Sequence, residues 1–355
     1  MVKYIYKLKK KIIIILSLLA LLLIGYSLSN IFENKKSVIA ESAQDKLILS
    51  LFSADNKGSM LSLDVNSKTE NYLITDKQVA ITGDLSLDDS KVMYADALNE
   101  SDPWQIYSYN VADGKNIQLT DTKFGKSHVK VSQDDSVYFL TSSNGKVKVA
   151  KINTETKLQE TIDSENLDRE VDAFDIKDNK LILSTDSSSL RLKNWSENNG
   201  KQKPMSHTIF QVDPNGDNLK EIATVKASLI ESISYTSNVK KVIIGGSDIN
   251  DDSGFGIYEL SLDTGTITTI LTDKNLASID ESIVSEIAHP VLAKMSKDES
   301  LIYFAGIPKD SKKVTIAEMS CYPTAIFSYN ISTKELKEVF NPKVPSLIFD
   351  MNIKY

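Results

Sequence analysis

Cysteine and arginine are almost absent from this chain. Its 355 residues include one cysteine, Cys321, so no disulfide can form within the chain. Arginine occurs only at Arg169 and Arg191, which leaves few side chains able to grip a phosphate or carboxylate at two points. The formal net charge is −7, and an acidic chain without a clustered basic surface is unsuited to binding nucleic acid. These absences exclude a small disulfide-stabilised domain and predict no nucleic-acid partner.

Recognisable catalytic motifs are also missing. The sequence contains no Gly-x-Ser-x-Gly motif of the α/β-hydrolase type. Its histidines, His128, His207 and His289, are too far apart in the sequence to match a metal-binding motif, and we interpret them as surface or structural residues. We interpret Cys321 as a small buried side chain rather than a nucleophile. The sequence therefore predicts a protein that is not an enzyme and has no catalytic residues.

The N-terminal region is strongly hydrophobic after a basic start. Residues 1–11 include five lysines and no acidic residue, and residues 12–32 carry no charge. A helix of this length at about 1.5 Å per residue matches the thickness of the hydrocarbon core of a membrane. The preceding lysines favour a cytoplasmic N-terminus, which places the rest of the chain outside. We therefore expect a basic tail over 1–11 and a single transmembrane anchor over 12–32.

A second interpretation of this region stays open. The short apolar centre and the segment 27–29 also fit a signal peptide that is cleaved and releases a secreted protein. Residues 33–44 are polar and without periodicity, which is typical of a short stalk. Both interpretations export the domain that we expect over residues 45–355, either anchored to the cell membrane or secreted.

A short polar sequence motif recurs through the rest of the chain. Its aligned residues, Asp88, Asp134, Asp178, Asn238 and Asp298, are separated by 44 to 60 residues. Each copy is a polar turn followed by an alternating run rich in β-branched and aromatic residues, which is the pattern of a β-strand. Self-similarity at such a period is typical of propellers and solenoids.

Each repeat contains four predicted strands, the number found in a propeller blade. Turn sequences such as 113–114, 215–216 and 264–265 precede the last strand of their repeats. Six blades are predicted near residues 46–75, 79–121, 127–163, 169–224, 229–273 and 283–341.

The two ends of the predicted domain complete one another. Residues 45–50 resemble residues 179–184, so the chain enters its first blade after the polar turn and lacks that blade's first strand. Residues 346–352 have the pattern of such a first strand. Placing them beside 47–51 closes the ring and removes exposed sheet edges. We therefore predict an all-β fold, a six-bladed β-propeller of four-stranded blades closed by the C-terminal strand.

The repeats resemble those of the TolB-like (WD-like) propeller family. The resemblance rests on the Ser-x-Asp turn with its following strand, on the runs 106–110 and 257–261, and on the Leu-Thr pairs 119–120 and 271–272. It covers residues 45–355 and implies a propeller fold, while it specifies little about function. The Pro and Gly usual in the family's turn are missing here, and its separate N-terminal α/β domain has no counterpart, so the resemblance implies a divergent member.

Four long insertions fall between the second and third strands of their blades, at 96–104, 185–207, 246–255 and 306–324. Loops at this position all emerge on one side of a propeller, and insertions in repeat proteins mark the binding side. Aromatic and arginine side chains are common anchors of interfaces. Packing against the blades is the alternative role, above all for the tryptophans. The candidate partner-binding residues are Trp104, Arg191, Trp195, Phe255 and Tyr322.

The acidic segment 248–254 partly resembles a calcium loop. Asp248, Asn250, Asp252 and Glu259 offer oxygen ligands at positions one, three, five and twelve. Ser253 stands where such loops carry glycine, and Glu259 falls in a predicted strand, so an ordinary acidic turn is the alternative. Calcium is the one cofactor for which the sequence offers candidates.

Three functions are compatible with these observations. The first is a non-catalytic, membrane-anchored, extracytoplasmic propeller that binds a protein or a cell-envelope component through its insertion-rich loops. The second is a structural partner within a membrane complex. The third is an exported hydrolase or lyase that uses carboxylates in the central funnel, although a fold alone does not specify an activity.

Overall fold

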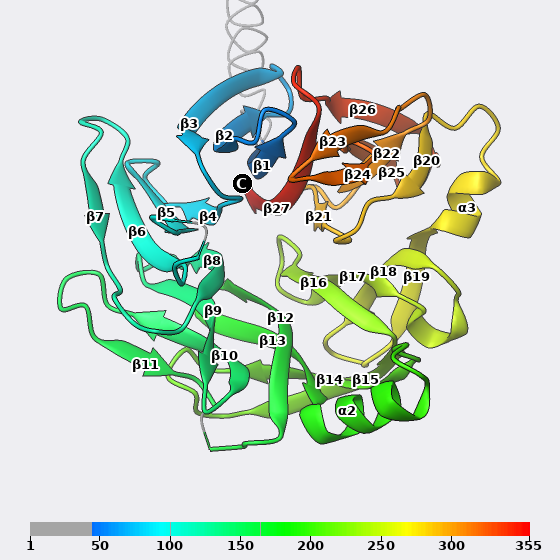
Figure 1. Ribbon diagram of the computed structural model, residues 1–355. Coiled ribbons are helices and arrows are strands. Elements are labelled where there is room, and N and C mark those ends of the chain that lie inside the picture. Colours follow the sequence, from blue (N-terminus) through cyan, green and yellow to red (C-terminus); the bar gives the residue numbers. More distant parts are fainter. Residues whose placement is uncertain (1–44, 100, 164) are drawn as a thin grey trace, which may run out of the picture. The chain divides into compact units, whose positions relative to one another are not determined.

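The computed structural model describes residues 45–355 except residues 100 and 164. These residues form a ring of six β-sheets around a central axis (Figure 1). The predicted basic tail, anchor and stalk lie outside the described residues. Within the described residues, no helix has both the length and the apolar character needed to cross a membrane.

Five blades each pair four antiparallel strands in the order predicted, and blade 6 has five because its inner strand is divided into β20 and β21. The bounds, from the inner strand outward, are as follows. Blade 1 contains β27 (Ser346–Lys354), β1 (Lys46–Ser53), β2 (Gly58–Asp64) and β3 (Thr69–Lys77). Blade 2 contains β4 (Thr82–Leu85), β5 (Lys91–Asp96), β6 (Gln105–Asn110) and β7 (Asn116–Gln118). Blade 3 contains β8 (Lys126–Val131), β9 (Val137–Ser143), β10 (Lys146–Ile152) and β11 (Gln159–Thr161).

The second half of the ring carries additional elements. Blade 4 contains β12 (Arg169–Lys177), β13 (Lys180–Ser187), β14 (Met205–Val212) and β15 (Lys220–Ala227), with helix α2 (Ser188–Glu197) between β13 and β14. Blade 5 contains β16 (Leu229–Tyr235), β17 (Lys241–Ser247), β18 (Phe255–Ser261) and β19 (Ile267–Thr272), with the 3-10 helix η1 (Ile249–Asp251). Blade 6 contains β20 (Val284–Ile287) and β21 (Ala293–Met295), β22 (Leu301–Pro308), β25 (Ala325–Asn330) and β26 (Leu336–Phe340). Helix α3 (Asp273–Ala277) precedes blade 6, and the hairpin β23 (Val314–Ile316) and β24 (Met319–Cys321) projects from it.

The predicted closure of the ring is confirmed. Strand β27 pairs antiparallel with β1, and Leu47 faces Ile353 while Leu51 faces Ile348. Figure 1 shows the last strand, in red, beside the first, in blue. Because β27 pairs with β1, the inner edge of β1 is covered and the first blade is complete.

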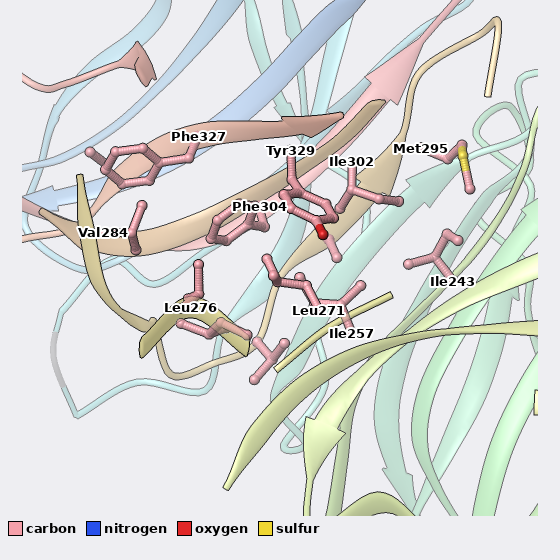
Figure 2. Close-up of a cluster of buried hydrophobic side chains, with 14 residues drawn as sticks. Ile243, Ile257, Leu271, Leu276, Val284, Met295, Ile302, Phe304, Phe327 and Tyr329 are labelled. Atoms are coloured by element: carbon pink, nitrogen blue, oxygen red, sulfur yellow. The ribbon is translucent and has the colours of Figure 1, made fainter. Parts of the chain in front are cut away.

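The hydrophobic core is divided into six clusters, each between two neighbouring blades. Figure 2 shows the cluster between blades 5 and 6, where Ile257 and Leu271 meet Phe304 and Phe327, and Leu276 of α3 covers one side. Gly245 allows blade 5 to approach its neighbour closely, since a Cβ atom there would lie 2.5 Å from the Val291 carbonyl oxygen. Burial of apolar surface between blades, at roughly 25 cal/mol per Å², drives the ring together.

The recurring polar turns stabilise themselves locally. In blade 2 the Ser86 hydroxyl donates to Asp88 at 2.7 Å, and the Ser90 amide donates to the same carboxylate at 3.0 Å. Hydrogen bonding, led by that from Ser86, lowers the pKa of Asp88 to about 2. Blade 4 differs, because Asp178 and Asn179 both adopt positive φ in a two-residue turn. This shorter turn has no place for the two serines that donate to the aspartate in blade 2.

Candidate functional site

The four long loops emerge on one side of the ring, because all four join the second and third strands of their blades. We call this side the insertion face. It comprises the loops 97–104, 188–204, 248–254 and 309–324, of which residue 100 is not described, and the segments that join each blade to the next. The opposite side carries the polar turns, and we call it the turn face.

Helix α2 is the largest structure on the insertion face and was not predicted from the sequence. Ser187 caps its N-terminus by accepting a hydrogen bond from the Leu190 amide at 3.2 Å. Asp168, on the segment before blade 4, accepts from the Ser187 hydroxyl at 2.6 Å and from the Ser189 amide at 2.9 Å. Hydrogen bonding, led by that from Ser187, lowers the pKa of Asp168 to about 2. The start of α2 is therefore fixed to blade 4 by a carboxylate that complements the helix dipole.

Arg191 fixes the middle of α2 to the same blade. Its guanidinium lies 3.3 Å from Asp186 and 3.8 Å from Asp172, and it also contacts Glu170. Glu170 and Asp172 come from β12, and Asp186 comes from β13. One of only two arginines in the chain therefore neutralises an acidic cluster formed by two adjacent strands.

His207 completes this cluster from the start of β14. Its Nδ1 atom lies 2.9 Å from Asp172, and its Nε2 atom lies 3.2 Å from the Ala227 carbonyl oxygen. The charge and hydrogen bond of Asp172 outweigh the opposing effect of burial, the largest single influence, so the pKa of His207 is raised. Burial, and then the charge of Asp172, raise the pKa of Asp186 to about 7.

Asp172, Asp186 and His207 have side chains that can coordinate a metal ion. One ligand atom of each lies within 4.8 Å of the others, and this is the only such group of three among the residues that the structure describes. Arg191 already supplies positive charge to both carboxylates. We therefore interpret the cluster as an ion-pair network that fixes α2 rather than as a metal centre.

The exposed side of α2 is partly apolar. Trp195 is 55% exposed, and Leu190 and Leu192 of the same helix are also exposed. The Trp195 ring lies against Gly200, which takes a positive φ just after the helix and whose amide donates to the Trp195 carbonyl at 2.9 Å. The tryptophan is thus held in place while its ring stays open to solvent.

The other predicted binding residues lie on separate blades and are not brought together. Trp104 is half-buried and packs against the cores on both sides of blade 2. Phe255 is half-buried and stacks on His289, with ring centroids 5.7 Å apart. Tyr322 is exposed, and Lys313 lies over its ring at 5.3 Å. Trp195 and Tyr322 are therefore open to a partner, whereas Trp104 and Phe255 mainly pack against the blades.

The residues of the expected calcium loop do not converge. Asp248 accepts from the Ser228 hydroxyl at 2.7 Å and from the Gly254 amide at 3.0 Å. Asp252 accepts from Tyr258 and Thr269, while Glu259 pairs with Lys241 at 3.0 Å. Asn250 lies within η1 at a positive φ. Each carboxylate thus has its own protein partner, as in an ordinary acidic turn.

Sequence reasoning missed the acidic partners of Arg191. The spacing of Glu170 and Asp172 is a usable signal, because residues two apart on a strand share one face. Asp186 carries no such signal, since only the pairing of β12 with β13 places it opposite Glu170.

Comparisons with known proteins support the fold. No family model and no curated protein matches the sequence. TolB from Acinetobacter baumannii superposes with a TM-score of 0.60 at 12% identity, over 85% of this chain and 65% of that chain. A chain from the nidogen–laminin complex gives a TM-score of 0.56 at 8% identity, over 87% of this chain and 98% of that chain. A putative TolB from Agrobacterium tumefaciens gives a TM-score of 0.53 at 7% identity, over 88% of this chain and 99% of that chain. Such low identities support the fold alone, and the chain is a six-bladed β-propeller with the fold of the TolB-like propellers.

Proposed function

We propose that this chain is a non-catalytic binding propeller that captures a protein partner through its insertion face. The observation that carries the proposal is Trp195, a half-exposed aromatic side chain on helix α2, which Asp168 and Arg191 fix to blade 4. Binding hot spots are enriched in such aromatic side chains, and a rigid support lowers the entropy lost on binding.

The distribution of exposed apolar side chains supports the same face. Most of the exposed large hydrophobic side chains among the described residues lie in its loops or in the segments between blades. They are Leu98, Phe124, Leu167, Leu190, Leu192, Trp195, Ile283, Met319, Tyr322 and Val344. An accumulation of apolar side chains on one side marks an interaction surface better than scattered ones do.

The proposed location is outside the cytoplasm, at the membrane. The uncharged segment 12–32 after a lysine-rich start supports a retained anchor with its propeller outside, as the positive-inside rule predicts. A fold shared with TolB and with a chain of the nidogen–laminin complex supports binding as a use of such a propeller. A cell-envelope polymer is the alternative ligand of the same face, and a structural role in a membrane complex would use it too.

The alternative of a hydrolase or lyase in the funnel has weaker support. Asp84 and Asp175, two carboxylates of the funnel, each accept a hydrogen bond from a backbone amide of the next blade, at 3.0 Å from Val131 and 2.8 Å from Tyr235. Carboxylates held in this way connect neighbouring blades. We therefore assign them a structural role.

A capture experiment with matched variants tests the proposal. The full chain, its Trp195→Ala variant and its Leu87→Ala variant are each used to capture partners from intact cell envelopes. Leu87 is a suitable control because it is 65% exposed and lies on the turn face. We expect Trp195→Ala to weaken binding of the captured partner about 10-fold or more, the loss of a typical hot spot, and Leu87→Ala to leave it unchanged.

Two further measurements separate the parts of the proposal. Equal melting temperatures of the three proteins would show that the loss is one of binding. Protease treatment of intact cells should digest the propeller if it faces outward. Unchanged capture by Trp195→Ala, or loss of capture by Leu87→Ala alone, would contradict binding through the insertion face.

A further inference from the structure

A cavity of about 300 Å³ lies at the centre of the ring and opens on the turn face. Its rim includes Leu87, Ser237 and Lys297 from the polar turns, and Tyr355 from the end of β27. Toward the insertion face it meets a much smaller chamber of about 30 Å³. Lys130 and Lys294 line both spaces, so they lie where the two meet.

The floor of this cavity is formed by equivalent residues of the six inner strands. The strand registers place one residue of each blade at the same level of the central channel. In order around the ring these residues are Asn352, Asp84, Lys130, Asp175, Ser234 and Lys294. Lys130 belongs to blade 3 and Lys294 to blade 6. Opposite blades of a six-membered ring thus direct two ammonium groups toward the channel from opposite sides.

The charges at this level are unequally paired. Asp84 lies 3.3 Å from Lys354, and Lys130 donates a hydrogen bond to Asn352 and lies 4.0 Å from Asp350. Lys294 is 5% exposed, and among the described residues it makes no hydrogen bond and no ion pair. Burial, and then the charge of Lys130, lower its pKa to about 8. The Lys294 Nζ atom is not one of the fully buried atoms without a partner, so it is accessible from the cavity, where an anion could pair with it.

The mouth of the cavity adds further positive charge. Lys177, Lys297 and Lys354 line it, so that five lysines face the cavity against Asp84, Asp175 and Asp178. The smaller chamber adds the carboxylates of Glu231 and Asp350. The excess in the larger cavity is notable in a chain with a formal net charge of −7. A funnel lined by one sign of charge raises the local concentration of ions of the opposite sign.

We propose that the central cavity binds a small, multiply charged anion bearing carboxylate or phosphate groups, held between Lys294 and Lys130. The cavity lies on the opposite side of the ring from the insertion face, so the proposal is independent of partner capture. Its volume suits a small molecule rather than a folded segment of a partner.

The test measures the melting temperature of the full chain with citrate, inorganic phosphate or acetate at constant ionic strength, followed by titration calorimetry. Wild type and the Lys294→Met variant are compared, with Lys193→Met as a control, since Lys193 lies on α2 and its side chain is 66% exposed. We expect citrate or phosphate to raise the melting temperature of wild type and of the control. In Lys294→Met the dissociation constant should rise at least 10-fold.

The anion-free proteins provide a second readout. Lys294→Met should melt at or above the temperature of wild type, because it removes an ammonium that makes no hydrogen bond or ion pair with the described residues. Preference for citrate over phosphate would assign a carboxylate ligand, and the reverse would assign a phosphate. If neither anion stabilises wild type, or if both stabilise Lys294→Met equally, the proposal is overturned. Capture through Trp195 would be unaffected by that result.

Discussion

The turn face repeats one local structure, whereas the insertion face carries a different structure on each blade. In blades 2 and 6 the same hydrogen bonds recur, in which a serine hydroxyl and a backbone amide donate to one aspartate. On the other side, blade 4 carries a capped helix, blade 6 a hairpin, and blade 3 only the turn at 144–145. The repeated side thus maintains the ring, and the variable side can change without disturbing it.

The buried Asp186 of the insertion face differs from the turn aspartates in the direction of its pKa shift. The turn aspartates accept several hydrogen bonds, so the pKa of Asp298, like that of Asp88, is lowered. On the insertion face, burial and the charge of Asp172 raise the pKa of Asp186 to about 7. Carboxylates on the turn face therefore favour the charged form, whereas Asp186 favours the neutral form.

The largest effect is expected from removal of Arg191, which tests whether its acidic cluster fixes α2 to blade 4. In Arg191→Met, Glu170, Asp172 and Asp186 lose their shared cation. We expect the free energy of unfolding to fall by about 2–4 kcal/mol, somewhat less than for a fully buried pair because Arg191 is partly exposed. Urea unfolding measures the loss, and limited proteolysis should show new cleavage within 188–204.

Lys193→Met is the matched control for that experiment. Lys193 pairs only with Glu197 on the surface of α2, and such pairs contribute little. We expect it to change stability by less than about 0.5 kcal/mol. Equal stability and equal protease resistance of Arg191→Met and wild type would show that the acidic cluster does not fix α2.

The pH dependence of stability should have opposite signs for Asp186 and Asp298. Asp186 binds its proton more tightly when folded, so its stabilising effect is present below about pH 4 and is lost as the pH rises through 7. Asp298 binds its proton less tightly when folded, so its effect is present above about pH 4 and is lost at lower pH.

Asparagine variants isolate the two effects in urea unfolding between pH 2 and 8. Asp186→Asn should gain about 1–2 kcal/mol on wild type between pH 4 and 8, a modest value because Arg191 offsets part of the charge. Asp298→Asn should be less stable than wild type above pH 4 and approach it at lower pH. If the free energy of unfolding of both variants changed with pH in parallel with that of wild type, the pKa shifts of Asp186 and Asp298 would be contradicted.

The smallest effect is expected from a single polar turn. In Asp298→Ala the hydroxyls of Ser296 and Ser300 and the Ser300 amide lose their acceptor. Because the turn is open to water, we expect a loss of about 0.5–1.5 kcal/mol. A fall of the melting temperature by a few degrees would confirm this, and Lys297→Ala in the same turn should cause none.

The sequence was sufficient to predict the ring but not its binding surface. The repeated turns and the likeness of 45–50 to 179–184 predicted six blades and the closing strand, because period-two patterns and turn residues are local signals. Helix α2 was missed because Ser188–Glu197 is largely polar and lacks an apolar stripe. The partners of Arg191 were missed because strands β12 and β13 bring them together only in the folded blade.

The central claim is that partner binding and ring maintenance occupy opposite faces. Hydrogen–deuterium exchange of the chain with and without its captured partner tests this claim most directly. We predict slower exchange over 188–204 and 309–324 in the complex, with the polar turns 86–90 and 296–300 unchanged. Protection confined to those turns, with 188–204 exchanging as in the free chain, would contradict it.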